Sequence, residues 1–113
     1  QTALLGFSQG TMTALQVALR HSVALAGVVG FSGALVGAGV LAEEIKQRPP
    51  ICLIHGTADP VVPFAAMQEA EEALRSLHVP VVTHARPGLP HSIDEVGLRI
   101  AVSFLKERLY ATA

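Results

Sequence analysis

Apolar residues in this chain occur either in short unbroken runs or at helical spacing. Three apolar runs, at 3–7, 24–31 and 51–55, have the length of buried strands, and residues 79–85 are expected to form a fourth strand. Apolar side chains recur three or four positions apart in residues 9–21, 63–77 and 92–109, which predicts three amphipathic helices. Between the second and third runs we expect a loop over 33–39 and a short helix over 41–47, ended by the two prolines at 49 and 50. The predicted order is β-α-β-loop-β-α-β-α.

The same spacing predicts which face of each long helix is buried. The expected inner residues are Met12, Leu15 and Leu19 with Ala14 and Val17 beside them, then Met67, Ala70, Leu74 and Leu77, and finally Ile93, Val96, Ile100 and Phe104. Pro63 suits the first position of the second long helix. Ser92 is the expected N-cap of the last helix, with Glu95 completing a capping box.

Strands that alternate with helices predict an α/β fold with a parallel sheet of about four strands and flanking helices. In such sheets, functional side chains gather at the carboxyl ends of the strands. No repeat or linker divides the sequence, so we expect residues 1–113 to form one domain unit.

Composition narrows the class of protein. The chain is 50% hydrophobic and 15% charged, which suits a sheet buried on both faces and equally suits a piece of a larger domain. The sequence begins inside an apolar run without a methionine, so we expect it to have been cut from a longer chain. Its formal net charge of −1 and its lack of tryptophan argue against nucleic-acid binding.

Three further features bear on location and redox chemistry. The single cysteine, Cys52, lies in an apolar strand, so we expect a buried and inert thiol. No signal-peptide pattern is visible, and the expectation is a cytoplasmic protein. Residues 23–42 carry no charge and are long enough to span a membrane, but five glycines favour a strand and a loop instead.

A glycine-flanked serine lies between the first strand and the first helix. Gly6-Phe7-Ser8-Gln9-Gly10 fits the pattern G-x-S-x-G, in which small neighbours permit a sharp turn that exposes the serine hydroxyl. The amides at the start of the next helix point toward developing negative charge. The alternative is an ordinary turn in which Ser8 merely caps the helix.

An aspartate and a histidine follow the third and fourth strands. Asp59 is placed to accept an N–H from an imidazole, although alone it would more often be a turn residue before proline. His91 lies on the loop before the last helix, where a general base can reach a nucleophile. We interpret the other histidines as structural or exposed: His21, His55, His78 and His84.

The conjunction of the three residues is more specific than any of them alone. Ser8, Asp59 and His91 each follow a strand, in the order Ser…Asp…His found in α/β-hydrolases. Residues 4–10, Phe31-Ser32-Gly33, and the segment from His55 to Pro63 resemble the carboxylesterase/phospholipase family, also described as acyl-protein thioesterase-like. The resemblance covers nearly the whole chain and implies the C-terminal half of an α/β-hydrolase domain.

The resemblance implies a serine hydrolase that needs no metal or cofactor. Ser8 would be the nucleophile, Asp59 the orienting acid, His91 the base, and Gln9 would supply one oxyanion amide. The implied substrates are carboxylic esters, lysophospholipids or acyl thioesters. Leu35, in the apolar loop, would line the acyl pocket by its position alone.

Two departures from the family pattern matter. A proline, Pro90, precedes His91 where the family usually has a small or flexible residue. Family members are also roughly twice as long, and the half not represented here supplies the first four strands and a second oxyanion amide. The loss of one oxyanion donor typically costs a factor of about 10²–10³ in rate.

The absent half would leave residues 3–7 as an unpaired apolar edge, so we expect a homo-oligomer through that edge. Two rival functions remain open on sequence alone. One is a catalytically inactive fragment or binding module that retains the fold. The other is a membrane-associated protein spanning residues 23–42.

Overall fold

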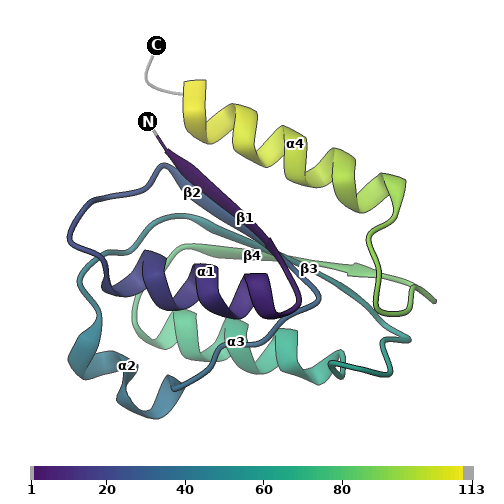
Figure 1. Cartoon of the computed structure of the whole chain (residues 1–113), viewed down its shortest axis with the longest axis horizontal. Helices are drawn as coiled ribbons and strands as arrows, with labels where there is room; N and C mark the ends of the chain where they lie inside the picture. The colour runs from purple at the N-terminus through teal and green to yellow at the C-terminus, as the bar shows by residue number, and fades with distance from the viewer. Residues whose placement is uncertain (1, 111–113) are drawn as a thin grey trace.

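A four-stranded parallel sheet forms the centre of the computed structural model, which describes residues 2–110 (Figure 1). The strands are β1 (Ala3–Phe7), β2 (Gly27–Phe31), β3 (Ile51–Gly56) and β4 (Val81–Arg86), and their order across the sheet is β1-β2-β3-β4. The helices are α1 (Gln9–Arg20), α2 (Ala38–Glu44), α3 (Ala65–Ser76) and α4 (Glu95–Tyr110). The predicted α/β class, with about four parallel strands and flanking helices, is confirmed.

The register brings the carboxyl ends of the strands to one edge of the sheet. Phe7 of β1 pairs with Phe31 of β2, and Phe31 in turn pairs with Ile54 of β3. His55 and Gly56, at the end of β3, pair with the last two residues of β4. The segments that follow the four strands therefore begin close together.

Helices cover both faces of the sheet, but in unequal numbers. Figure 1 shows α4 alone on one side, with α1 and α3 on the other and α2 at the end of that layer. Every residue of β2 and β3 is buried. Helices pack on both faces of these two strands, which suits their apolar sequences; His55, near the end of β3, is the one polar side chain in them.

Most boundaries agree with the sequence-based prediction within one residue, and the larger differences of two or three residues fall mainly at the starts of elements. The second strand begins at Gly27 rather than at residue 24, and α2 begins at Ala38, three residues earlier than predicted. The helix predicted from Pro63 begins at Ala65, because the carbonyl of Pro63 first accepts the Ala66 N–H in a tight turn. Helix ends are the least constrained part of an apolar pattern.

Ser92 is not the N-cap of the last helix, so that prediction was wrong. The Ser92 N–H donates to the Pro90 carbonyl, and the chain is still turning at this point. Asp94 caps α4 instead: its Oδ1 accepts the Gly97 N–H at 2.8 Å and its carbonyl accepts the Leu98 N–H at 3.0 Å. Aspartate is as good a cap as serine, and here its other oxygen also binds Arg86.

The buried face of α4 is made of smaller residues than predicted. Gly97, Ala101 and Phe104 are buried, whereas Ile93 and Val96 are 40% and 44% exposed. A Cβ on Gly97 would lie 3.4 Å from Ile54 and 3.5 Å from Phe31, so the helix lies directly on the sheet at this position. On α1, Val17 is likewise exposed, and Ala18 is buried in its place.

The apolar segment 23–42 is divided between the buried strand β2, a loop and the short helix α2. Among the described residues, no helix is both long enough and apolar enough to cross a membrane. Residues 23–42 therefore do not form the single continuous helix that the spanning alternative assumed.

Candidate active site

The turn between β1 and α1 holds Ser8 in a conformation that is rare outside glycine. Its φ is 55° and its ψ is −116°. The Ser8 N–H donates to the Phe31 carbonyl at 2.8 Å, and the Ser8 carbonyl accepts the N–H groups of Thr11 and Met12. The Ser8 side chain makes no capping bond to the helix, so the serine occupies the cap position without acting as a cap. The hydroxyl is left free for another partner.

The two glycines of the motif have different surroundings. A Cβ at Gly6 would lie 2.5 Å from the carbonyl of Gly10, so no larger residue fits there. A Cβ at Gly10 would meet nothing within 4 Å in the part of the chain that the structure describes. The expectation that both neighbours must be small therefore holds at Gly6, and packing within this chain does not require it at Gly10.

Asp59 follows β3 and is buried. Its Oδ1 accepts the N–H groups of Val61 and Val62 at 2.8 and 2.9 Å, which closes a turn. Its Oδ2 accepts Nδ1–H of His91 at 2.8 Å. The turn-residue interpretation and the imidazole-binding interpretation are thus both satisfied, each by a different oxygen of the same carboxylate.

The pKa of Asp59 lies below its ordinary value although the group is buried. Burial by itself raises this pKa, because a carboxylate loses hydration. The hydrogen bond from His91 and the backbone N–H groups of Val62 and Val61 outweigh that cost, since all of them donate to the ionised form. The carboxylate is therefore ionised and accepts from all three donors.

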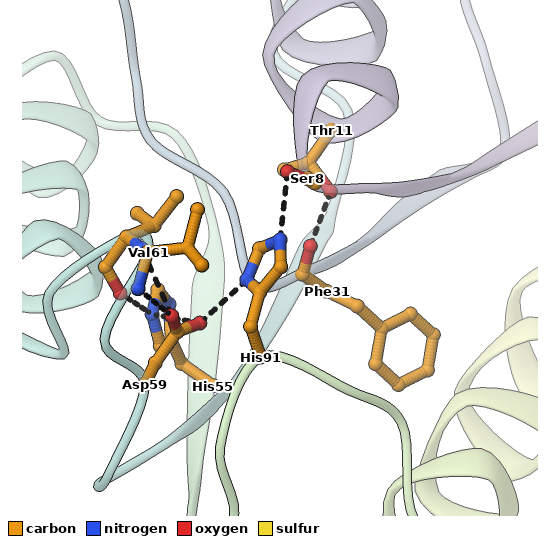
Figure 2. A network of polar contacts seen from close by, with 8 residues as sticks. Ser8, Thr11, Phe31, His55, Asp59, Val61 and His91 are labelled. Atoms are coloured by element: carbon orange, nitrogen blue, oxygen red, sulfur yellow. Dashed lines mark hydrogen bonds and ion pairs between the residues drawn. The ribbon is translucent and has the colours of Figure 1, made fainter.

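His91 connects the other two residues. Its Nδ1 carries a proton, because the ionised Asp59 carboxylate can only accept. Its Nε2 lies 3.0 Å from Ser8 Oγ and is left to accept the hydroxyl proton in the neutral ring. Figure 2 shows the imidazole lying between the serine and the aspartate. With Pro90 immediately before it, the ring still reaches both partners.

The loop that carries His91 rests directly on the segment that carries Asp59. A Cβ at Gly56 would lie 2.0 Å from the Leu89 carbonyl oxygen, so only glycine permits this approach. The same carbonyl accepts the Ala58 N–H at 3.0 Å, and the Gly88 N–H donates to Thr57 Oγ1 at 2.8 Å. Glycine at position 56 thus allows two loops, more than thirty residues apart in sequence, to pack together.

One ring face of His91 lies against Phe7. The two ring centroids are 4.9 Å apart and the planes are tilted by 42°. At the other end of the loop, Arg86 Nε donates to Asp94 Oδ2 at 2.8 Å. The guanidinium of Arg86 holds the pKa of Asp94 below its usual range, with help from the Gly97 N–H. The His91 loop is therefore tied at both ends.

The two remaining predicted site residues, Gln9 and Leu35, differ in exposure. Gln9 is the first residue of α1 and is exposed; the first N–H groups of a helix have no acceptor within the helix. Leu35 is half-buried on the loop before α2. It lines a hollow of about 280 Å³ between α2 and α3, together with Ala34, Ala38, Ala66, Glu69 and Ala70.

His55 belongs to this site although its sequence pattern predicts only a structural role. It is 2% exposed, and its Nε2 lies 2.8 Å from the Val62 carbonyl and 3.4 Å from Asp59 Oδ2. The signal available in the sequence was its position at the end of a strand, at the same sheet edge as Asp59.

Across residues 2–110, no group of three or more His, Cys, Asp or Glu side chains is arranged to hold a metal ion.

Cys52 is buried in β3, as expected from its apolar neighbours. Burial raises the pKa of this thiol to about 11, and nearby Arg108 offsets only part of that rise. The thiolate is the reactive form of cysteine, so this residue is chemically inert at neutral pH.

Known proteins with similar sequences are hydrolases. The sequence profile of the family described as phospholipase/carboxylesterase matches residues 1–109. Lysophospholipase-like protein 1 of Mus musculus is 33% identical over 108 residues, which is 92% of this chain and 45% of that protein. Esterase YpfH of Escherichia coli is 33% identical over 105 residues, which is 93% of this chain and 44% of the esterase.

Solved structures of similar fold also include an esterase. The crystal structure of esterase PE8 is 40% identical and superposes with a TM-score of 0.91, covering 94% of this chain and 49% of the esterase. Arabidopsis thaliana SOBER1 is 32% identical with a TM-score of 0.88, covering 95% and 52% of the two chains. The chain thus spans about half the length of the relatives it matches. By sequence and by fold, it belongs to the phospholipase/carboxylesterase family of α/β-hydrolases.

Proposed function

We propose that this chain carries the catalytic residues of a serine ester hydrolase, with Ser8 as nucleophile, His91 as general base and Asp59 as the residue that orients His91. The observation that carries the proposal is the position of one imidazole, 3.0 Å from Ser8 Oγ and 2.8 Å from Asp59 Oδ2. A serine hydroxyl is a weak nucleophile unless an adjacent base removes its proton. We propose that His91 is that base, because its Nε2 lies within hydrogen-bond distance of Ser8 Oγ.

The reaction has two halves. Ser8 Oγ attacks the acyl carbonyl while His91 Nε2 takes the hydroxyl proton, and Asp59 stabilises the imidazolium that forms. His91 then gives the proton to the leaving alcohol or thiol, and an acyl-enzyme remains. A water molecule, deprotonated by His91, attacks the acyl carbonyl; the bond to Ser8 Oγ then breaks, His91 returns the proton to Ser8 Oγ, and the acid leaves.

The developing oxyanion needs hydrogen-bond donors. We propose that the backbone N–H of Gln9 is one of them, because Gln9 is the first residue of α1 and its N–H has no acceptor within the helix. The family resemblance assigns a second donor to the N-terminal half of the domain. Full activity of this chain is therefore expected only when that half is supplied.

The decisive test is labelling with a fluorophosphonate probe, read by intact mass. We expect one adduct per chain, absent in Ser8→Ala. Ser32→Ala is a matched control, since Ser32 also follows a strand with a positive φ of 53° but is buried, with a hydroxyl that has no partner among the described residues. This control is expected to label like the wild type.

Absence of labelling would favour the alternative of an inactive fragment or binding module. The chain would then be co-expressed with the N-terminal half of a relative such as Esterase YpfH and tested again. No adduct in the reconstituted protein would overturn the proposal for Ser8 itself.

The proposed substrates are carboxylic esters or acyl thioesters, because relatives are named esterases, a lysophospholipase-like protein and, in Gibberella zeae, acyl-protein thioesterase 1. We propose that Leu35 and the hollow beside it receive the acyl chain. Leu35→Asp is expected to reduce turnover of long-chain esters more than turnover of acetyl esters. An equal loss of turnover for long-chain and acetyl esters would show that Leu35 does not contact the acyl chain.

Two further proposals concern assembly and location. β1 pairs with one strand only in the described sheet, and Leu5 is 51% exposed, so we propose that the isolated chain self-associates through this edge. A monomer in sedimentation at micromolar concentration would contradict this. The cytoplasmic location is a prediction that fractionation of the source cells would test.

A further inference from the structure

His55 is a buried imidazole that the mechanism above does not use. It lies at the end of β3 with only 2% of its surface exposed, so no substrate reaches it. Burial of a polar group costs free energy unless a hydrogen bond compensates it. An apolar residue would suit this central strand better, and the reason for a histidine must lie in the contacts of its ring.

The ring nitrogen Nε2 of His55 holds the turn that follows Asp59. It lies 2.8 Å from the Val62 carbonyl oxygen. A carbonyl can only accept, so Nε2 carries the proton. The N–H of Val62 in turn donates to Asp59 Oδ1 at 2.9 Å. Val62 is thus fixed from both sides, by Asp59 within the turn and by His55 from the end of β3.

The same nitrogen also faces the oxygen of Asp59 that binds His91. His55 Nε2 lies 3.4 Å from Asp59 Oδ2, and His91 Nδ1 lies 2.8 Å from that same oxygen. Figure 2 shows the His55 ring beside the Asp59 carboxylate, on the side away from Ser8. The carboxylate is therefore held by its own turn at one oxygen and faced by two imidazoles at the other.

We propose that His55 is a positioning residue: by donating from Nε2 to the Val62 carbonyl, it holds the Asp59 turn so that Oδ2 meets His91 Nδ1. The inference rests on the proposed function of Ser8, Asp59 and His91. His55 touches neither Ser8 nor the reacting atoms and acts only through Asp59. Its loss displaces the carboxylate, and a displacement of about 1 Å in such a constellation costs roughly 10²-fold in rate.

Two amide substitutions separate positioning from packing. Glutamine places its side-chain N–H close to the position of histidine Nε2, whereas asparagine is one carbon shorter and does not reach Val62. We expect His55→Gln to label with fluorophosphonate at nearly the wild-type rate and His55→Asn to label roughly 10²-fold more slowly, both per folded molecule. Equal rates in the two variants, whether fast or slow, would overturn the proposal.

A second measurement does not depend on activity. In ¹⁵N-edited NMR of the wild type, His55 should be the Nε2–H tautomer and His91 should give a downfield Nδ1–H signal from its bond to Asp59. We expect that His91 signal to persist in His55→Gln and to be lost to solvent exchange in His55→Asn. An Nδ1–H tautomer for His55, or loss of the His91 signal in His55→Gln, contradicts the proposal even if His55→Asn fails to fold.

The two measurements also separate this inference from the proposed function. If the wild-type chain does not label, the serine hydrolase activity of this chain fails, while the His91 signal still reports whether His55 holds Asp59 in place. If the wild type labels and the His91 signal is the same in both variants, only the role of His55 fails.

Discussion

The two faces of the sheet differ in how completely they are covered. On one face, α1, α2 and α3 enclose the larger apolar cluster, in which Leu15, Leu19 and Leu74 have no more than 1% of their surface exposed. On the other face, α4 alone packs across the two central strands. Its cluster is smaller and contains Val29, Phe31, Cys52, Ile54, Ala101 and Phe104.

On the α4 face of the described sheet, the two outer strands β1 and β4 are not covered by a helix, and apolar side chains on them are exposed. Leu5 of β1 and Val82 of β4 are 51% and 43% exposed, and Leu98 and Val102 on α4 itself are about half exposed. On the α4 face, an apolar position is therefore buried on the central strands β2 and β3 but exposed on the outer strands β1 and β4. One helix covers about two strands of a parallel sheet, so burial depends on how many helices share the face.

The difference between the two faces predicts that substitutions beneath α1, α2 and α3 lower the free energy of unfolding the most. Leu74→Ala removes a fully buried side chain and is expected to lower the free energy of unfolding by about 2–5 kcal/mol. Val102→Ala, a deletion from the exposed side of α4, should change it by less than about 0.5 kcal/mol. Denaturant unfolding measures both. Similar losses at the two positions would mean that the two faces are equally covered.

A second test probes the close contact between α4 and the sheet. Gly97→Leu is expected to cost about 1–3 kcal/mol, because the new side chain meets Asp94, Ile54 and Phe31. Gly39→Leu in α2 is the matched control, since a Cβ there meets nothing within 4 Å and helix propensity improves in both variants. If Gly97→Leu is as stable as the control, α4 does not depend on close approach.

The cap of α4 makes this face sensitive to acid. The pKa of Asp94 is lowered in the folded state by Arg86, so its ionised form stabilises the fold. That contribution is present above the unfolded value of about 3.9 and is lost as the pH falls below it toward the folded value. Asp94→Asn keeps a capping oxygen but cannot ionise.

Unfolding midpoints measured between about pH 6 and pH 3 should therefore fall less steeply in Asp94→Asn than in the wild type. Asp59, whose pKa is also lowered, contributes to acid sensitivity in both proteins and cancels in the comparison. Identical pH profiles for the wild type and Asp94→Asn would mean that ionisation of Asp94 does not contribute to stability in this pH range.

The smallest effect on stability is expected at the open edge. Leu5→Lys exchanges a half-exposed residue of β1 and should change the free energy of unfolding by no more than about 0.5 kcal/mol. A charge on an edge strand opposes strand pairing, so the sedimentation coefficient should fall toward that of a monomer. Leu98→Lys on α4 is the control. An equal shift in both variants would place self-association on α4 as well.

The segments that could be predicted from the sequence are those whose surroundings are uniform. β2 and β3 are enclosed on both faces, and their unbroken apolar runs identify them directly. The stripe of α3 was equally clear, since Met67, Ala70 and Leu74 are all buried as expected. On α4 the same method chose Ile93 and Val96 and missed Gly97 and Ala101, because close packing favours small residues that periodicity ignores.

The sequence by itself determined the order of strands and helices, the turn at Ser8 and the sheet edge at which Ser8, Asp59 and His91 gather. Those features follow from local patterns and from the rule that parallel strands end at one edge. Only the tertiary structure decided which oxygen of Asp59 faces His91, why residue 56 is glycine, and that His55 contacts the Asp59 turn. These depend on contacts between individual atoms that form only in the folded chain, which no local pattern of apolar and polar residues encodes.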